Sequence, residues 1–221
     1  MPKRYELLVN GEFYHVYNRS SWNQDLFNNQ SRIKRALELI NYYRYSQTLR
    51  YSKYKILSYD RKVDYLAGVR SGGAIVKIYS YSLMPDHYHL EIEQTVDGGI
   101  KKFITNFQNA YARYFNLRNN NRGSLFINPF KSKRIEKDKY FLHLSRYIHL
   151  NPVSSYLCKF DELSKDVRSS LRFYVSGNTN SFIDTKLILS IVGSKENYLK
   201  FLKDRVDYQK TLRNIRRYFL E

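Results

Sequence analysis

The sequence has a single cysteine, Cys158, among its 221 residues, and it has no long apolar run. A lone cysteine excludes an intramolecular disulfide and any zinc cluster built from several cysteines, and it suits a reducing compartment. No apolar stretch approaches the roughly 20 residues that cross a bilayer, and the first residues, MPKRYELLVNGEFY, lack the apolar core of a signal peptide. We therefore expect a cytoplasmic protein without a membrane partner.

Acidic residues are also scarce: 20 Asp and Glu stand against 38 Lys and Arg, a net charge of +18. Residues 1–100 hold 14 basic and 10 acidic side chains, so the remaining 121 residues hold 24 and 10. Such an excess predicts attraction to polyanions, with nucleic acid as the leading partner. The 22 tyrosines could stack on unpaired bases, although the codon usage of an AT-rich genome would also enrich tyrosine. Apolar residues make up 43% of the chain, which indicates a packed domain.

Hydrophobic periodicity divides the chain into an α and β pattern. Alternating or aromatic runs predict strands over 12–18, 74–83 and 87–94, and 124–135 reads as an extended basic segment. Apolar residues at three- and four-residue spacings predict helices over 31–45, 100–119, 138–151, 184–191 and 198–202. Residues 46–73 are polar, and we interpret them as a long excursion of the chain away from the core. Pro152 is expected to stop the third long helix. We expect a domain over 1–155 and a basic helical extension over 156–221, with Arg213, Arg216 and Arg217 in its tail, packed on the same domain.

His87, Tyr88 and His89 lie inside a predicted strand. Successive side chains of a strand point to opposite faces, so the two imidazoles project on one side and can share a cation, while Tyr88 points the other way. Two exposed histidines without any function remain an alternative. A metal usually needs further ligands, which directs the search to other elements.

The helix predicted over 138–151 offers a nucleophile and a ligand together. Tyr147 and Asn151 are four residues apart and share a helical face, whereas the residues four beyond Tyr111 and Tyr114 do not help to hold a cation. Tyr147 could instead be an ordinary core tyrosine, and Asn151 could simply end the helix before proline. His149 lies on another side of this helix, and His15 and His143 read as packing or hydrogen-bonding residues.

These residues suggest a phosphoryl-transfer site. In this hypothesis His87, His89 and Asn151 hold a divalent ion that polarises a DNA phosphate, because a phenol with an ordinary pKa near 10 is a poor nucleophile. Tyr147 then attacks and keeps the 5′ phosphate. The covalent bond allows strands to be rejoined without ATP.

Four segments together resemble the REP-associated tyrosine transposases, relatives of the small single-tyrosine insertion-sequence transposases of the HUH class. They are YHVYNRS (14–20), LMPDHYHLEI (83–92), YFNLRNNNRGSLF (114–126) and LHLSRYIHLNPV (142–153). The resemblance runs from about residue 11 to about residue 205. It departs at Tyr88, where relatives carry an aliphatic residue, and at Pro129, where many carry an arginine.

The resemblance implies an α+β, ferredoxin-like fold with an antiparallel sheet and helices packed on one face. It implies His87 and His89 as metal ligands, Tyr147 as nucleophile and Asn151 as third ligand. It also implies Mg²⁺ or Mn²⁺ as cofactor and single-stranded or hairpin DNA from repeated palindromic elements as substrate, so that the protein would be nucleoid-associated. Monomer and homodimer both remain open.

Candidate phosphate contacts are basic side chains near these segments, and a solvated basic face is the alternative reading for each. They are Arg19, Lys131, Lys133, Arg134 and Arg146. Three other functions compete with a DNA endonuclease and strand transferase: a non-catalytic hairpin-binding protein, an RNA-binding module, and a replication initiator or relaxase that uses the same histidine pair.

Overall fold

The computed structural model describes residues 7–22, 24–136, 138–177, 181–207 and 209. Its centre is a four-stranded antiparallel sheet in the order β2-β3-β1-β4. The strands are β1 (Phe13–Arg19), β2 (Val76–Leu83), β3 (His87–Gln94) and β4 (Lys131–Arg134). The helices are α1 (Gln30–Tyr43), α2 (Tyr51–Lys55), α3 (Tyr59–Ser71), α4 (Gly99–Asn119), α5 (Asp138–Ser154), α6 (Leu171–Ser176), α7 (Lys186–Val192) and α8 (Lys195–Lys203), with a short 3₁₀ turn at Phe160–Glu162.

β2 and β3 form a hairpin at one edge of the sheet. β2 is the edge strand, and β3 pairs with β1 in the middle of the sheet. The turn of the hairpin is closed by the backbone N–H of Met84, which donates to the carbonyl of His87 at 2.8 Å. β1 pairs with β3 along its whole length, from Phe13 opposite Glu93 to Arg19 opposite His87. The predicted strands and their antiparallel connection are confirmed, and the extended basic segment contains β4.

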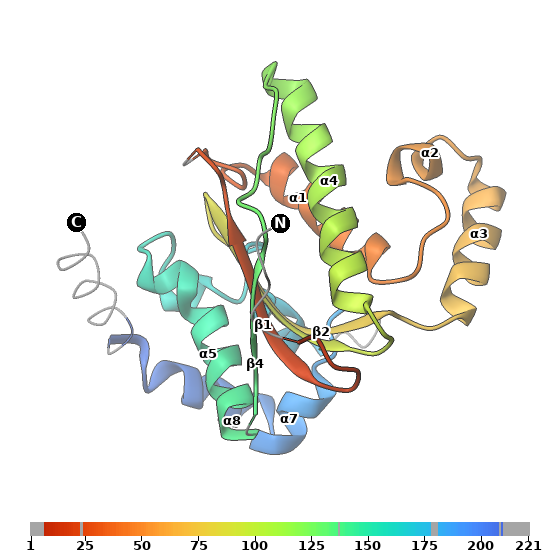
Figure 1. Ribbon diagram of the computed structural model, residues 1–221. Helices are drawn as coiled ribbons and strands as arrows, with labels where there is room; N and C mark the ends of the chain where they lie inside the picture. The colour runs from red at the N-terminus through yellow and green to blue at the C-terminus, as the bar shows by residue number, and fades with distance from the viewer. Residues whose placement is uncertain (1–6, 23, 137, 178–180, 208, 210–221) are drawn as a thin grey trace.

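Helices cover both faces of this sheet, so the expectation of helices on one face is wrong (Figure 1). On one face Tyr88 packs against Phe107 of α4, and on the other His89 contacts Tyr147 of α5. β3 is buried on both sides: α4 covers the face with Tyr88, Leu90 and Ile92, and α5 covers the face with His89 and Glu91. The α+β class and the antiparallel sheet are confirmed.

The large Tyr88 is accommodated on the α4 face. Its ring is fully buried, and its hydroxyl accepts a hydrogen bond of 2.8 Å from the side-chain amide of Gln108. A buried phenol that keeps a partner costs little, so the departure from an aliphatic residue does not disturb the sheet.

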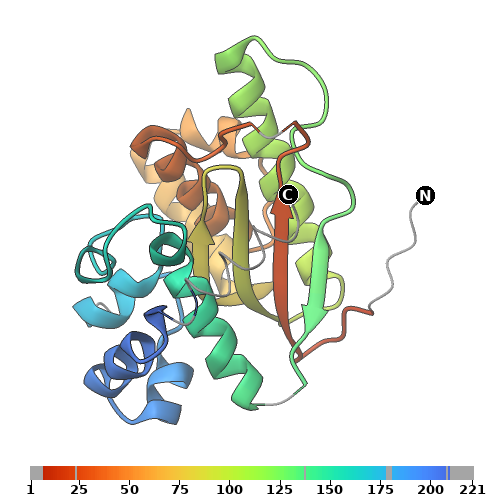
Figure 2. The ribbon, with the colours of Figure 1, turned by 90° about the vertical axis from the view of Figure 1, so that its left-hand side faces the viewer.

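α5 crosses the opposite face of the sheet and runs past the expected end at Asn151 (Figure 2). It contains Pro152 and ends at Ser154. Proline removes one helical hydrogen bond, but Val153 and Ser154 are both buried, and this packing holds the last turn in helical form. Asn151 is therefore an interior residue of the helix and does not end it.

Residues 46–73 do not form the irregular excursion that their polarity suggested, since they contain α2 and α3. α3 buries none of its residues, so it lacks the apolar stripe that would have predicted a helix. After α5, the chain forms α6, α7 and α8, which lie beside α5 at one end of the sheet (Figure 2). The predicted helices near 184–191 and 198–202 correspond to α7 and α8, whereas Arg213, Arg216 and Arg217 lie outside the described residues.

No helix in the described part of the chain combines the length and apolar character that a bilayer crossing requires.

Candidate active site

The sheet face under α5 carries both histidines of β3. His87 and His89 are two residues apart in the strand, so both side chains project from the same face. Their ring centroids lie 5.1 Å apart, with the ring planes nearly perpendicular. The pair is thus brought together as the strand periodicity predicted.

Asp86 fixes the orientation of His87. Its carboxylate lies 2.6 Å from Nδ1 of His87, and its other oxygen makes an ion pair of 2.9 Å with Arg19. The hydrogen bond from His87, aided by Arg19, holds the pKa of Asp86 well below its ordinary value, so the group is a carboxylate. A carboxylate on Nδ1 sets the tautomer of an imidazole and directs its Nε2 toward a ligand, as the outer partners of metal-binding histidines do.

His89 has a partner that the sequence did not reveal. Nε2 of His15, from β1, lies 2.9 Å from Nδ1 of His89, and the two rings stack at 5.1 Å. Burial, together with the charge of Lys133, lowers the pKa of His15 to about 4, so this imidazole is neutral at physiological pH. His15 was expected to pack or to form hydrogen bonds. It does so against the candidate ligand, because β1 and β3 pair in a register that no local pattern encodes.

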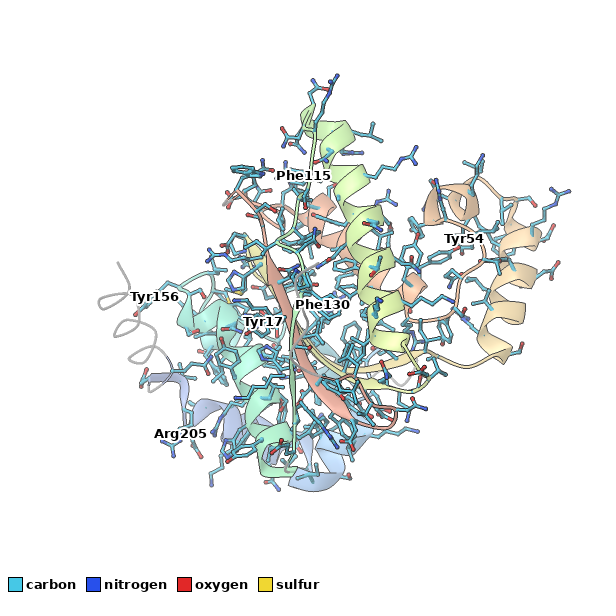
Figure 3. All side chains as sticks on the ribbon, in the orientation of Figure 1. Tyr17, Tyr54, Phe115, Phe130, Tyr156 and Arg205 are labelled. Atoms are coloured by element: carbon cyan, nitrogen blue, oxygen red, sulfur yellow. The ribbon has the colours of Figure 1, made fainter. Side chains whose placement is uncertain are left out.

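Tyr147 reaches this cluster from α5. Its ring centroid lies 5.6 Å from that of His89 and 6.2 Å from that of His15, and both contacts are edge-to-face. Tyr17 stacks on His15 from the other side, at 4.7 Å, and Figure 3 shows it between β1 and α5. One phenol from the helix therefore stands directly over the imidazoles of the sheet.

Asn151 lies one helical turn beyond Tyr147. At the start of α5, Phe141 packs against Phe13, which is opposite Glu93, so the helix advances from the Glu93 end of β3 toward its His87 end. Four residues of helix advance about 6 Å, and two residues of strand advance about 6.7 Å. Asn151 therefore lies farther than Tyr147 toward the His87 end of β3.

The side chain of Asn151 is buried, and its Nδ2 has no hydrogen-bond partner in the described chain. An unpartnered buried amide costs free energy, so it points to a group that the protein alone does not supply. A half-turn about the last side-chain bond exchanges the amide nitrogen and oxygen, and the oxygen is then a cation ligand.

A further acid lies beneath the imidazoles. Glu91 is fully buried in the row of the sheet that contains His15, and it accepts a hydrogen bond of 2.7 Å from Ser80. Burial raises the pKa of Glu91 well above its ordinary value. Burial thus favours the protonated form of this carboxyl group, which sequence analysis did not single out.

The five candidate phosphate contacts lie in different surroundings. Lys131 and Lys133 of β4 are opposite Tyr17 and His15 of β1, so they share the face of the imidazoles, and both are exposed. Arg19 is bound to Asp86 but more than half of its side chain is exposed. These three residues form the basic margin of the site.

The other two candidates have partners away from the imidazoles. Arg134 is opposite Tyr14 on the other face of the sheet and makes an ion pair with Glu12 at 2.5 Å. Arg146 stacks on Phe201 at 4.0 Å, and burial lowers the pKa of its guanidinium. The structure does not bring Arg134 and Arg146 to the imidazole cluster.

The competing tyrosines and histidines lie elsewhere. Tyr111 and Tyr114 belong to α4, on the opposite face of the sheet, and the hydroxyl of Tyr111 donates to the carbonyl of Leu26 at 2.6 Å. His149 is fully buried, with Nδ1 2.7 Å from the hydroxyl of Tyr198 and Nε2 2.7 Å from that of Ser170. Burial lowers the pKa of His149 to about 3.

The donors of this site fit a divalent ion that accepts both nitrogen and oxygen ligands. No three His, Cys, Asp or Glu side chains in the described ranges are grouped to hold a metal by themselves. The protein can supply two imidazole nitrogens and one amide oxygen as ligands. A site with imidazole and hard oxygen ligands is compatible with Mn²⁺ and other divalent ions. The orphaned amide of Asn151 and the carboxylate behind His87 both agree with such an ion.

Comparisons with known proteins bear on this arrangement. The family described as "Transposase IS200 like" matches residues 52–151, a range that contains His87, His89, Tyr147 and Asn151. A solved structure of a REP-associated tyrosine transposase bound to a REP hairpin resembles the chain with a TM-score of 0.50 and 13% identity, covering 84% of this chain and 94% of that one. That likeness supports the fold.

No curated protein sequence matches the chain. Residues 52–151 are thus similar to the IS200-like transposases, which confirms the resemblance seen in the motifs.

Proposed function

We propose that the protein is a metal-dependent endonuclease and strand transferase that cuts single-stranded or hairpin DNA through a 5′-phosphotyrosine on Tyr147. The observation that carries this proposal is the position of the Tyr147 ring over the imidazoles of His15 and His89. Among the tyrosines considered from the sequence, Tyr147 alone lies on the face of the sheet that carries the histidine pair. The similarity of residues 52–151 to the IS200-like transposases supports the same class of reaction.

The residues that would hold Mg²⁺ or Mn²⁺ are His87, His89 and Asn151. Such an ion, when bound, withdraws charge from a phosphate oxygen and makes the phosphorus more electrophilic. Asp86 and His15 act through the two histidines: each engages Nδ1 of one ring and thereby sets the direction of its Nε2. Both are positioning residues in this proposal.

Lys131 and Lys133 would bind the phosphates that flank the scissile bond, and Arg19 would add a third contact. These side chains border the imidazoles on the exposed margin of the sheet. Phosphate contacts of this kind hold the strand in place without reading its sequence. Arg134 and Arg146 are weaker candidates because their charges already have partners within the protein.

The hydroxyl of Tyr147 would attack the phosphorus in line with the bond to the 3′ oxygen. A bond forms between Oη and phosphorus, the bond to the 3′ oxygen breaks, the phenol proton passes to water, and the departing 3′ oxygen takes up a proton. In the reverse direction, the 3′ hydroxyl of another strand attacks the phosphotyrosine and releases the phenol. The number of phosphoester bonds is unchanged, so rejoining requires no ATP.

A covalent-adduct assay tests this function. Hairpin DNA with a single-stranded flank and a label on the 3′ side of the cut is incubated with the protein and Mg²⁺ or Mn²⁺. We expect a labelled band that survives denaturation, depends on the ion and is absent from Tyr147→Phe. Tyr140→Phe is the matched control, because this half-exposed tyrosine lies two turns earlier in α5. DNA binding without any adduct would instead identify a non-catalytic hairpin-binding protein, and tighter binding of the corresponding RNA would favour the RNA-binding alternative.

A further inference from the structure

A cavity of about 660 Å³ lies among α1, α2 and α4, apart from the histidines. α4 covers the sheet face opposite α5, and α2 and α3 form an arm that stands beside α4 (Figure 1). None of the residues of the candidate active site borders this cavity. Its volume falls in the range of roughly 300–1,000 Å³ that is typical of small-ligand sites.

Four basic side chains line the cavity, and no acidic side chain does. They are Arg35, Arg50, Lys55 and Arg113. Arg35 has a long ion pair of 3.4 Å with Glu38, whereas the other three make no ion pair with any described residue. Cations gathered around one hollow without counter-charges repel one another, so the site favours an anionic ligand such as a phosphodiester.

Aromatic and apolar groups form the remaining walls. The guanidinium of Arg35 lies between two rings, 5.2 Å from the centroid of Tyr51 and 5.1 Å from that of Tyr114. Leu117 borders the same space and is 73% exposed, so its apolar surface is open to a ligand. A planar base can stack on such a surface, whereas a free phosphate ion would leave it wet.

Amide groups stand close to this surface. Asn106 and Asn109 of α4 face the cavity and carry both donors and acceptors. Unpaired bases expose hydrogen-bonding edges that such amides can satisfy. The lining therefore offers what a nucleotide needs: cations for the phosphate, a flat apolar wall for the base and amides for its edge.

Hydrogen bonds and ring contacts fix the position of α2, which forms one wall of the cavity. The hydroxyl of Tyr65 accepts backbone hydrogen bonds from Thr48 and Leu49 at 3.1 and 3.0 Å and donates to Gln47 at 2.9 Å. Tyr54 packs between Tyr42 and Tyr65, at 5.0 and 5.9 Å, and is labelled in Figure 3. A preformed wall lowers the entropy cost of binding.

Packing against the core does not by itself explain the arm formed by α2 and α3. α3 buries none of its residues, and the 46–73 segment joins the core through Tyr51, with Tyr54, Tyr65 and Leu66 partly buried against it. What it does is close one side of a basic, aromatic cavity. We propose that this cavity is a second nucleic-acid site, which binds an unpaired nucleotide of the DNA at a distance from the catalytic face. Arg50, Lys55 and Arg113 would bind its phosphates, and the base would stack on the wall formed by Arg35, Tyr114 and Leu117.

Binding to this site does not require cleavage, so it is tested in the Tyr147→Phe protein. Fluorescence anisotropy with a labelled dT₁₂ strand, and with a hairpin that carries a dT flank, compares Arg50→Glu/Arg113→Glu with Lys159→Glu/Lys165→Glu. Both double variants change the charge equally at exposed positions. We expect the cavity variant to lose roughly tenfold or more in affinity, because two phosphate contacts are replaced by negative charges, and the control to lose about twofold or less. Equal losses in the two variants would overturn the proposal.

A crosslinking experiment locates the base directly. Single-stranded DNA that contains 5-iododeoxyuridine is irradiated with the full chain, and the modified peptide is identified by mass spectrometry. We expect crosslinks to Tyr114, lost in Arg50→Glu/Arg113→Glu, in addition to any on the histidine face. Crosslinks confined to the histidine face would contradict the second site and leave the proposed catalysis standing. A missing adduct at Tyr147 with intact crosslinking at Tyr114 would contradict the catalysis alone. RNA of the same sequence competing more strongly than DNA would overturn the assignment of the ligand as DNA.

Discussion

His15 of β1 and His89 of β3 face each other across neighbouring strands, with Nε2 of one ring 2.9 Å from Nδ1 of the other. Because the pKa of His15 is lowered to about 4, its ring is neutral at physiological pH, and the tautomers of the two rings decide which of them donates. A hydrogen bond at Nδ1 limits rotation of the His89 ring and fixes which nitrogen can bind a ligand. The relationship makes His15 part of the candidate site although it need not touch DNA or metal.

Removal of His15 should therefore weaken metal binding. Partners of metal-binding histidines typically contribute about 10-fold to 100-fold in metal affinity. We expect His15→Ala to bind Mn²⁺ about tenfold more weakly in titration calorimetry, and to form the covalent adduct more slowly at low Mn²⁺. His15→Gln, whose amide can reach the position of Nε2, should recover part of both. Unchanged Mn²⁺ affinity in His15→Ala would show that the contact is only structural.

A second prediction concerns the unpaired amide of Asn151. A buried polar group without a partner costs about 1–3 kcal/mol, so a leucine of similar volume should stabilise the metal-free protein. We expect Asn151→Leu to raise the free energy of unfolding by about 1 kcal/mol in urea with EDTA. The same variant should lose adduct formation. If it is both less stable and active, the amide serves the fold and does not serve the reaction.

Much of the candidate site could be predicted because its spacing is local. The period of two along β3 places His87 and His89 on one face, and the period of the helix places Tyr147 and Asn151 together. His15 could not be found in this way, since its proximity to His89 depends on the register between β1 and β3, strands separated by more than seventy residues along the chain.

The same distinction explains the errors in the fold. α3 has no fully buried residue and contributes only the partly buried Tyr65 and Leu66 to the core, so its periodicity was too weak to predict a helix. Pro152 is a reliable helix breaker in isolation, but burial of Val153 outweighs the lost hydrogen bond. The stacking of Arg146 on Phe201, which lies more than fifty residues later in the chain, also depends on tertiary structure and has no local signal.

The basic margin of the site should govern how binding responds to salt. Each phosphate contact to single-stranded DNA contributes about 0.7 to the slope of log affinity against log salt concentration. We expect Lys131→Gln/Lys133→Gln to reduce that slope by about 1.4, measured by anisotropy between low and moderate salt. Lys159→Gln/Lys165→Gln is the control for a change of charge elsewhere. A slope that stays the same in the β4 variant would mean that Lys131 and Lys133 only face solvent.

The two buried imidazoles should make the fold sensitive to acid. Burial lowers the pKa of His149 to about 3 and, with Lys133, that of His15 to about 4, whereas both rings titrate near 6.5 in the unfolded chain. Between these values each of the two histidines binds more protons in the unfolded state than in the folded state, so their contribution to stability is complete above about pH 6.5 and is lost as the pH drops toward 4. Each histidine should contribute a slope of about 1.4 kcal/mol per pH unit in that window. Urea unfolding in EDTA at several pH values measures the slope of stability against pH for both histidines together. His149→Gln should reduce this slope by the contribution of one histidine, even if the variant is less stable at every pH. A slope unaffected by this substitution would show that His149 takes up its proton without unfolding the protein.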